Sequence, residues 1–379
     1  MTINNKNKKA NVPNLRFPEF QGEWEKCILG DITENFNLRN KDKIQYPMFS
    51  VTNDRGFVPQ SEQFEGRDMV GEDIKAYKII HTNDFAYNPA RINVGSIAMY
   101  TGEKPCMISS LYVCFKTTKE VNNEWLMQLL KTPKMNYYYN VNGEGGVRVY
   151  LFYPNFARIR MSIPKIEEQK KIAKLLNLID ERIATQNKII DKLQSLIKGI
   201  SSRIFTSIQG IEYRMGDIVT ITNGNSNVQD AVTQSKDGLY PFFDRSEDIK
   251  YLPTFLFDKE AIIYPGEGTE FMPRYFKGKF ALHQRCYAIF DFNEIINARF
   301  LYFYLKTRNS YFVKNAVGST VPSLRLDTFQ KLKVIIPPKK IQHSVSLCLS
   351  SMELKCNVEK KILHKLLKQK QYLLRQMFI

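Results

Sequence analysis

The sequence predicts an α+β protein with two similar α+β domains joined by two long helices, which form an antiparallel coiled coil. Three observations predict this fold class. The second half of the chain repeats the plan of the first, two stretches of about 40 residues carry a sustained heptad pattern, and the segments before them hold short aromatic and β-branched runs. With 379 residues and 43% hydrophobic residues, the chain can form ordinary hydrophobic cores.

The repeat is marked by an Ile-Pro pair followed by a Gln and a long apolar run. The stretch SIPKIEEQKKI begins at Ser162 and the stretch IIPPKKIQHSV begins at Ile335. Aligning Gln169 with Gln342 starts a series of matches whose offset drifts toward the N-terminus, as expected of a duplicated unit with variable loops. The matches are Pro164 with Pro337, Phe156 with Phe329, Phe205 with Phe378, 131–132 with 306–307, Gly143 with Gly318, 30–32 with 216–218, and 46–49 with 240–243.

A heptad seam runs through the last stretch of each copy. Apolar residues alternate at spacings of four and three, and the polar residues Gln186, Glu359 and Lys370 interrupt the pattern. A stripe of this length favours two helices packed on each other, with the polar positions fixing their register; the alternative is two unrelated surface helices. The predicted seam residues are Ile172, Leu176, Ile179, Ile183, Ile190, Leu193, Val345, Leu349, Met352, Leu363, Leu366 and Leu373.

Changes in the sequence pattern along the chain predict the boundaries of the domains and helices. They are an N-terminal leader at 1–24, a first domain at 25–164, a helix at 165–207, a second domain at 208–338 and a helix at 339–379. Proline ends ladder pairing, so each Ile-Pro pair suits the exit from a last strand. Inside the domains we expect strands at 84–87, 97–100, 111–115, 261–264 and 286–290, and short helices at 124–131 and 299–306.

The formal net charge of +17 points to a polyanionic partner. Much of the excess lies in the predicted helices, with nine Lys and Arg against five Asp and Glu over 165–207 and nine against two over 339–379. A charged helix face is also often a solvated surface, so both interpretations stay open. No apolar run is long enough for a secretory signal or a membrane helix, and we expect a cytoplasmic protein.

Motifs for catalysis or metal binding are missing from the sequence. The six cysteines include no CxxC pair and the four histidines have no metal-ligand spacing. The stretch Asn88-Pro89-Ala90-Arg91 is similar to the Asn-Pro-Pro-aromatic loop of amino-methyltransferases, but Ala and Arg replace the second Pro and the aromatic. No phosphate loop, nucleotide-type glycine turn or GxSxG elbow occurs. We therefore expect a binding protein that is not an enzyme.

Polar residues differ between the copies where the frame around them matches. After the shared Tyr-Pro-x-Phe stem, the first copy continues with residues 50–55 and the second with residues 244–247. In the alignment of the two copies, Ser109-Ser110 also matches Gln284-Arg285, and the loop 88–95 matches 265–274. A shared scaffold with unlike polar tips fits two readers of different DNA sequences, because Arg and Lys read guanine, Asn and Gln read adenine, and Glu or Asp reads cytosine. An ordinary solvated turn is the alternative at each tip.

Four stretches resemble the specificity subunit of type I restriction-modification enzymes. They are VPNLRFPEFQGEW at 12–24, YNPARINVGSI at 87–97, GEGGVR at 143–148 and IPKIEEQKKIAKLLNLID at 163–180. The order of variable domain, long helix, variable domain, long helix is also similar, so the resemblance covers nearly the whole chain. The second copy departs from the pattern at Ile341, where the first has Glu168.

The resemblance implies a DNA-recognition role. Each target recognition domain would read one half of a bipartite double-stranded DNA site, and the paired helices would hold the two readers at a fixed distance. Two methyltransferase subunits would bring S-adenosylmethionine and methylate adenine in each half-site, and two motor-nuclease subunits would use ATP and Mg for restriction. None of these cofactors is expected on this chain.

Ten residues are the predicted DNA contacts under this interpretation. They are Asn53, Arg55, Arg91, Asn93 and Arg148 in the first domain, and Arg245, Glu247, Arg274, Gln284 and Arg285 in the second. Two other functions stay open. One is a coiled-coil scaffold whose domains bind proteins, and the other is a methyltransferase of unfamiliar motif order that rests on Asn88-Pro89 alone.

Overall fold

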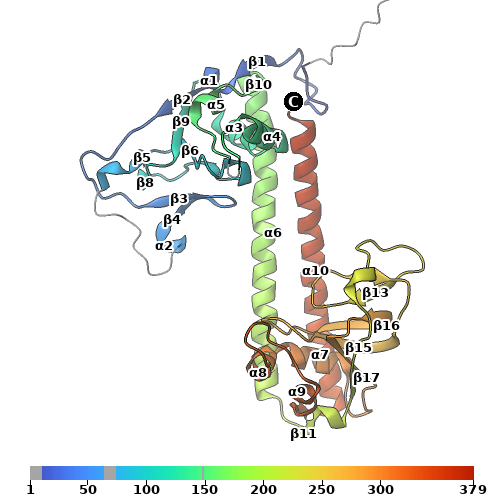
Figure 1. Ribbon diagram of the computed structural model, residues 1–379. Helices are drawn as coiled ribbons and strands as arrows, with labels where there is room; N and C mark the ends of the chain where they lie inside the picture. The colour runs from blue at the N-terminus through green and yellow to red at the C-terminus, as the bar shows by residue number, and fades with distance from the viewer. Residues whose placement is uncertain (1–10, 64–73, 147–148) are drawn as a thin grey trace, which may run out of the picture. The chain divides into compact units, whose positions relative to one another are not determined.

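The computed structural model describes residues 11–63, 74–146 and 149–379 and divides into two compact units (Figure 1). Unit 1 comprises Met1–Thr185 and Leu363–Ile379, and unit 2 comprises Gln186–Ile362. The two long helices, α6 (Ile166–Ser207) and α10 (Lys339–Gln376), each contribute to both units. Each unit therefore combines one α+β domain with a part of each long helix.

The domain of unit 1 is built on a four-stranded antiparallel sheet of order β2-β9-β6-β7. Three further antiparallel pairs, β1-β10, β3-β4 and β5-β8, complete its strands. The elements are β1 (Glu25–Ile28), α1 (Leu29–Ile32), β2 (Thr33–Phe36), β3 (Phe49–Thr52), β4 (Gly56–Pro59), α2 (Gln60–Gln63), β5 (Lys78–Ile80), β6 (Phe85–Tyr87), β7 (Ile97–Met99), β8 (Cys106–Ile108), β9 (Val113–Thr117), α3 (Asn123–Leu130), α4 (Pro133–Asn142), α5 (Tyr153–Ala157) and β10 (Arg160–Ile163).

The domain of unit 2 is built on a six-stranded sheet of order β12-β17-β15-β16-β13-β14. All neighbours are antiparallel except β13 and β16, and a separate antiparallel pair joins β11 to β18. The elements are β11 (Ile211–Arg214), β12 (Thr220–Asn223), β13 (Tyr240–Phe243), β14 (Lys250–Leu252), β15 (Phe257–Pro265), β16 (Arg274–Leu282), β17 (Cys286–Phe290), α7 (Ala298–Lys306), α8 (Asn309–Asn315), α9 (Leu326–Gln330) and β18 (Lys333–Ile336).

The two domains share one topology, which confirms the predicted duplication and fold class. Strand β9 lies between β2 and β6 as β17 lies between β12 and β15. In each copy the Tyr-Pro-x-Phe stem runs parallel to the strand that precedes β9 or β17. Met48 bridges Met107 of β8, and Phe242 pairs with Ala281 of β16. The closing strands β10 and β18 end immediately before Pro164 and Pro337, as expected of a residue that ends ladder pairing.

The predicted seam residues are all buried or half-buried, and they bring α6 and α10 together in each unit. In unit 1, Ile172 near the start of α6 shares a core with Leu373 near the end of α10. In unit 2, Phe205 at the end of α6 shares a core with Leu349 near the start of α10. The helices therefore run antiparallel.

Polar seam residues also pair across the two helices. Gln186 contacts Glu359, its own counterpart in the repeat, through a hydrogen bond of 2.6 Å from Nε2 to Oε2. In unit 1, Lys370 Nζ lies 2.5 Å from Asp180 Oδ1. An apolar partner facing either residue would leave a polar group without its hydrogen bond, so these pairs favour one helix register.

A buried glutamine fastens each domain to the start of its long helix, and we call Gln169 and Gln342 the glutamine anchors. Each is nearly inaccessible, at 1% and 0% exposed. In unit 2, Nε2 of Gln342 donates to two backbone carbonyls and Oε1 accepts from the N–H of Asn297, the N-cap residue of α7. One amide thus satisfies three backbone groups that belong to the last strand, a loop and a helix cap.

The same hydrogen bonds recur in unit 1. Gln169 donates to Pro164 at 2.9 Å and Glu120 at 3.1 Å and accepts from Asn122, the N-cap residue of α3, at 2.8 Å. The Gln342 bonds are 2.8 Å to Pro337, 2.8 Å to Ile295 and 2.7 Å from Asn297. The Gln that marks the repeat in the sequence is therefore a structural fastener and is not a contact for a ligand.

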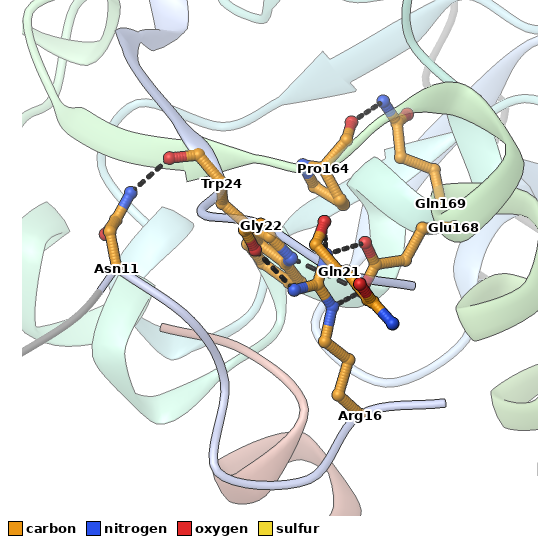
Figure 2. A network of polar contacts seen from close by, with 8 residues as sticks. All are labelled: Asn11, Arg16, Gln21, Gly22, Trp24, Pro164, Glu168 and Gln169. Atoms are coloured by element: carbon orange, nitrogen blue, oxygen red, sulfur yellow. Dashed lines mark hydrogen bonds and ion pairs between the residues drawn. The ribbon is translucent and has the colours of Figure 1, made fainter. Parts of the chain in front are cut away.

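Unit 1 carries one further fastener beside its anchor (Figure 2). Glu168 is 1% exposed and receives two hydrogen bonds from Arg16, at 2.8 and 2.7 Å, and one from Trp24 Nε1 at 3.3 Å. Residues 11–24, the described part of the predicted leader, are thereby fastened to the start of α6 within unit 1. At the equivalent site in unit 2, Ile341 is 44% exposed and makes no such contact. The two copies thus differ at this position because only Glu168 has residues 11–24 to hold.

Replacing Gln342 by Leu should lower the free energy of unfolding by about 2–4 kcal/mol, because buried backbone groups would be left without their partner. Urea unfolding of the full chain measures this change. Gln194→Leu is the matched control, since this Gln is exposed on α6 and its replacement should change stability by about 0.5 kcal/mol or less. Equal effects of the two changes would show that the anchor bonds are not stabilising.

Arg16→Ala should cost about 3–5 kcal/mol, because it leaves the Glu168 carboxylate buried without its cation. The double variant Arg16→Ala with Glu168→Ile should be more stable than Arg16→Ala alone, since it reproduces the apolar residue of the second copy. Urea unfolding of both proteins makes the comparison. A double variant no more stable than the single one would contradict the explanation.

Candidate nucleic-acid interface

The turn from β16 to β17, residues 283–285, presents two predicted contacts on a firmly held backbone. The N–H of His283 donates to Phe243 at 2.9 Å, that of Gln284 to Ser226 at 3.1 Å, and that of Cys286 back to His283 at 2.9 Å. The side chains of Gln284 and Arg285 remain exposed. The main chain supplies the rigidity here, and neither side chain is needed to hold the turn.

Two glycines allow neighbouring segments to reach this turn. A Cβ at Gly224 would overlap the carbonyl oxygen of Leu282, and one at Gly266 would overlap the carbonyl oxygen of Arg285. Any other residue at these positions would push the segments apart. Gly266 thereby places the next residue, Glu267, beside Arg285.

The loop after β13, residues 244–249, is organised by the buried carboxylate of Asp244. This group accepts from the Ser246 N–H at 2.8 Å and from Lys250 Nζ at 2.7 Å. Burial acts to raise the pKa of Asp244, but the hydrogen bonds from Lys250 and Ser246 outweigh it, and the pKa lies below the usual value. The loop therefore contains an ionised, internally paired carboxylate, and Arg245 and Glu247 project from it as exposed side chains.

Arg274, another predicted DNA contact, is half-buried and contributes to the same loop. Its guanidinium donates to the carbonyl oxygens of Asp244 and Glu247 and lies over the Phe243 ring, 5.2 Å from the ring centroid. Burial lowers the pKa of Arg274. These contacts make Arg274 a residue that positions the loop from inside the protein.

A hollow of about 550 Å³ lies between the 244–249 loop and the 283–285 turn. The structure brings together three predicted contacts at its edge, Arg245, Gln284 and Arg285. Lys250, His283 and Glu267 also line it, and none of the three was predicted from the sequence. The sequence gives little indication of these three residues, because only His283 is next to a predicted contact in the chain.

Two of the groups that line this hollow, Arg285 and His283, have fixed partners. Arg285 Nη1 lies 2.6 Å from Glu267 Oε1. Burial is the main cause that lowers the pKa of His283; the nearby carboxylate of Asp244 opposes the shift and Arg285 adds to it. Its Nδ1 accepts the backbone N–H of Arg285 at 3.2 Å, which is the acceptor role of a neutral imidazole. The other ring nitrogen then carries the proton and is a donor.

In unit 1 the tip of the β3-β4 hairpin lies against the loop 88–95. Asn53 and Arg55 are exposed at this tip. Gly95 has φ of +103°, and a Cβ there would come within 2.7 Å of the Asn53 carbonyl oxygen. Ser96 Oγ also donates to Val51 at 2.7 Å. Two of the segments selected from the sequence are thus neighbours.

The remaining predicted residues of unit 1 have different surroundings. Arg91 is exposed, whereas Asn93 is partly committed, because its amide donates to Asn140 on α4 at 3.0 Å. Arg148 lies outside the described residues. Asn88, from the methyltransferase-like stretch, accepts the N–H of Ala90 at 3.0 Å and so forms a local turn. As DNA contacts, all ten residues stay predictions.

Two other properties bear on the class of protein. Within residues 11–63, 74–146 and 149–379, no helix combines the length and apolar character needed to cross a membrane. In the same ranges, no three His, Cys, Asp or Glu side chains gather in a way that could hold a metal ion.

Comparison with known proteins gives the family. Residues 21–195 and 211–368 match the model of the type I restriction modification DNA specificity domain. The chain belongs to this family. The two matched segments correspond to the two copies of the repeat, each with its domain and the larger part of its long helix.

Curated relatives carry related names. A putative type I restriction enzyme MjaX specificity subunit from Methanocaldococcus jannaschii is 26% identical over 52% of this chain and 49% of that protein. The type I restriction enzyme EcoDI specificity subunit from Escherichia coli is 30% identical over 32% of this chain and 26% of that protein. The chain thus spans half or less of the length of these curated relatives.

The fold of this family member also matches a solved structure. The S subunit of a type I restriction-modification system from M. genitalium superposes with a TM-score of 0.66 and 15% identity, over 97% of this chain and 99% of that chain. At this identity the likeness concerns the fold alone.

Asp244→Ala should loosen the 244–249 loop without unfolding the domain. The pKa of Asp244 in the folded protein lies below the ordinary 3.8. The contribution of its carboxylate to stability is therefore present at neutral pH and is lost as the pH falls through this lowered pKa. Amide hydrogen exchange should therefore rise over 244–250 in the variant at pH 7. Asp258→Ala, an exposed change on β15, is the control and should leave this exchange unaltered.

Proposed function

We propose that this chain is the non-catalytic DNA specificity subunit of a type I restriction-modification complex, with each domain reading one half of a bipartite double-stranded site. One observation carries the proposal beyond family membership. The turn from β8 to β9 and the turn from β16 to β17 occupy the same place in the repeated topology, yet the first carries Ser109-Ser110 and the second Gln284-Arg285. One scaffold with unlike polar side chains suits two different base sequences.

The composition of the candidate surfaces supports DNA as the ligand. Exposed Arg, Asn and Gln side chains project from loops of both domains, and these are the residue types that pair with guanine and adenine edges. The net charge of +17 favours a polyanion. A protein-binding coiled-coil scaffold is less favoured, because it gives no reason for the two copies to differ at equivalent polar tips.

A methyltransferase activity of the chain itself is not supported. The side-chain oxygen of Asn88 accepts a hydrogen bond from the backbone of its own loop, as in an ordinary Asx turn. Two partner methyltransferase subunits would bind S-adenosylmethionine and modify adenine, and two motor-nuclease subunits would use ATP and Mg. In this proposal the complex acts in the cytoplasm, and none of those cofactors binds this chain.

The direct test is to express the chain with a type I methyltransferase subunit in a host that lacks other DNA methylation, and to map the modified bases across the genome. A two-part motif with a constant unspecified gap, methylated on opposite strands, is the expected result. A one-part motif would contradict the assignment of one reader to each domain. A stable complex that leaves DNA unmethylated and unbound would favour the scaffold.

Arg91→Ala should weaken binding by about 1–3 kcal/mol if Arg91 contacts a base, and the effect should be confined to one half of the motif. The measurement compares duplexes in which either half is scrambled, at a stated and constant salt concentration, because phosphate contacts make affinity salt-dependent. Equal weakening on specific and random duplexes, with a shallower dependence on salt, would instead make Arg91 a phosphate contact.

A further inference from the structure

We propose that Arg285, held in place by Glu267, reads a guanine in the half-site of the second domain. The proposal rests on the proposed function and deepens it, since it assigns one base to one side chain. Its ligand is the major-groove edge of guanine, whose N7 and O6 are two adjacent acceptors.

The geometry leaves the guanidinium ready for such a contact. The Arg285 side chain is 62% exposed, whereas the Glu267 side chain is 17% exposed. The 2.6 Å contact uses Nη1. Nε and Nη2 have no protein partner in the described part of the chain, so part of the planar fork can still donate to a base. Holding one nitrogen reduces the side-chain freedom that binding would otherwise remove.

The carboxylate also indicates a base edge over a phosphate. A phosphate contact derives its strength from net positive charge, and a carboxylate 2.6 Å from the guanidinium would offset that charge and repel the phosphate. A guanine edge is a neutral pair of acceptors, so it tolerates the nearby negative charge and gains from the fixed orientation. Glu267 is in this view a positioning residue.

The backbone around the pair is arranged to keep the two side chains together. Gly266 permits the end of β15 to approach the carbonyl of Arg285. The segment that follows is tied to a second loop, since Gly268 N–H donates to Pro322 at 3.0 Å and Leu324 N–H donates to Gly266 at 2.8 Å. Both ends of the ion pair therefore lie on hydrogen-bonded backbone.

Arg245 provides a matched control in the same hollow. It is exposed, and in the described residues no hydrogen bond or ion pair holds its side chain. Its charge is not offset by a fixed carboxylate, and it suits a phosphate. Arg285→Gln and Arg245→Gln remove the same charge from one surface, but the first should abolish a base interaction and the second a phosphate interaction.

The experiment uses the complex with its methyltransferase partner and duplexes carrying the mapped motif. Each guanine of the motif is replaced in turn by 7-deazaguanine, which lacks the N7 acceptor. For wild-type protein, one such replacement should weaken binding roughly 5- to 150-fold. Arg285→Gln should lose this sensitivity and accept other bases at that position, whereas Arg245→Gln should keep it while binding all duplexes less tightly.

Glu267→Gln tests the positioning role without removing the arginine. It should reduce the preference for the natural guanine while binding to random DNA stays equal or strengthens, because a negative charge is removed; a merely structural defect would lower both. If Arg285→Gln keeps the 7-deazaguanine sensitivity, or no guanine of the motif is sensitive, the proposal is wrong although the proposed function stands. If the wild-type complex yields no two-part motif, the proposed function itself fails.

Discussion

One buried amide in each unit fixes where the candidate DNA-reading loops stand on the long helices. The glutamine anchor bonds the end of the last strand, a loop carbonyl and the N-cap of the short helix behind the sheet, so three separate segments meet at one side chain. A buried backbone group without a partner costs about 1–3 kcal/mol. Each domain can therefore shift on its helix only by breaking several such bonds together, and the loops carried by the sheet keep a defined position relative to that helix.

The differences between the copies are as informative as the similarities. Glu168 and Ile341 occupy the same place in the repeat, and the carboxylate occurs where residues 11–24 supply Arg16 and Trp24 as donors. A carboxylate at the exposed position of Ile341 would have no such donors. The helix seam behaves similarly: Gln186 and Glu359 interrupt it at equivalent positions, and they contact each other. Polar departures from an apolar pattern in this chain are thus matched by a specific partner.

The sequence predicted the elements that depend on local pattern. The heptad seam, the strands expected at 84–87 and 286–290 and the helices expected at 124–131 and 299–306 follow from the periodicity of neighbouring residues, and the structure has these elements at Phe85–Tyr87, Cys286–Phe290, Asn123–Leu130 and Ala298–Lys306. The duplicated topology follows instead from the alignment of two distant stretches of the chain. The site was predicted less completely. Arg274 stays a prediction as a DNA contact, but its hydrogen bonds to carbonyl oxygens about 30 residues away were not predicted, nor was the contact of Glu267 with Arg285, because both depend on the approach of separate loops. Interactions of this kind have no periodic signature.

A division of labour between backbone and side chains explains how one scaffold can serve different sequences. The 283–285 turn is held by main-chain hydrogen bonds to Phe243 and Ser226, and neither bond depends on the identity of residue 284 or 285. Exposed side chains on such a turn can change with about 0.5 kcal/mol or less of effect on stability. The constraint falls instead on Gly224 and Gly266, where any side chain would separate the supporting segments. The fold therefore constrains the two glycines beside the predicted contact positions 284 and 285 and leaves those two positions free to vary.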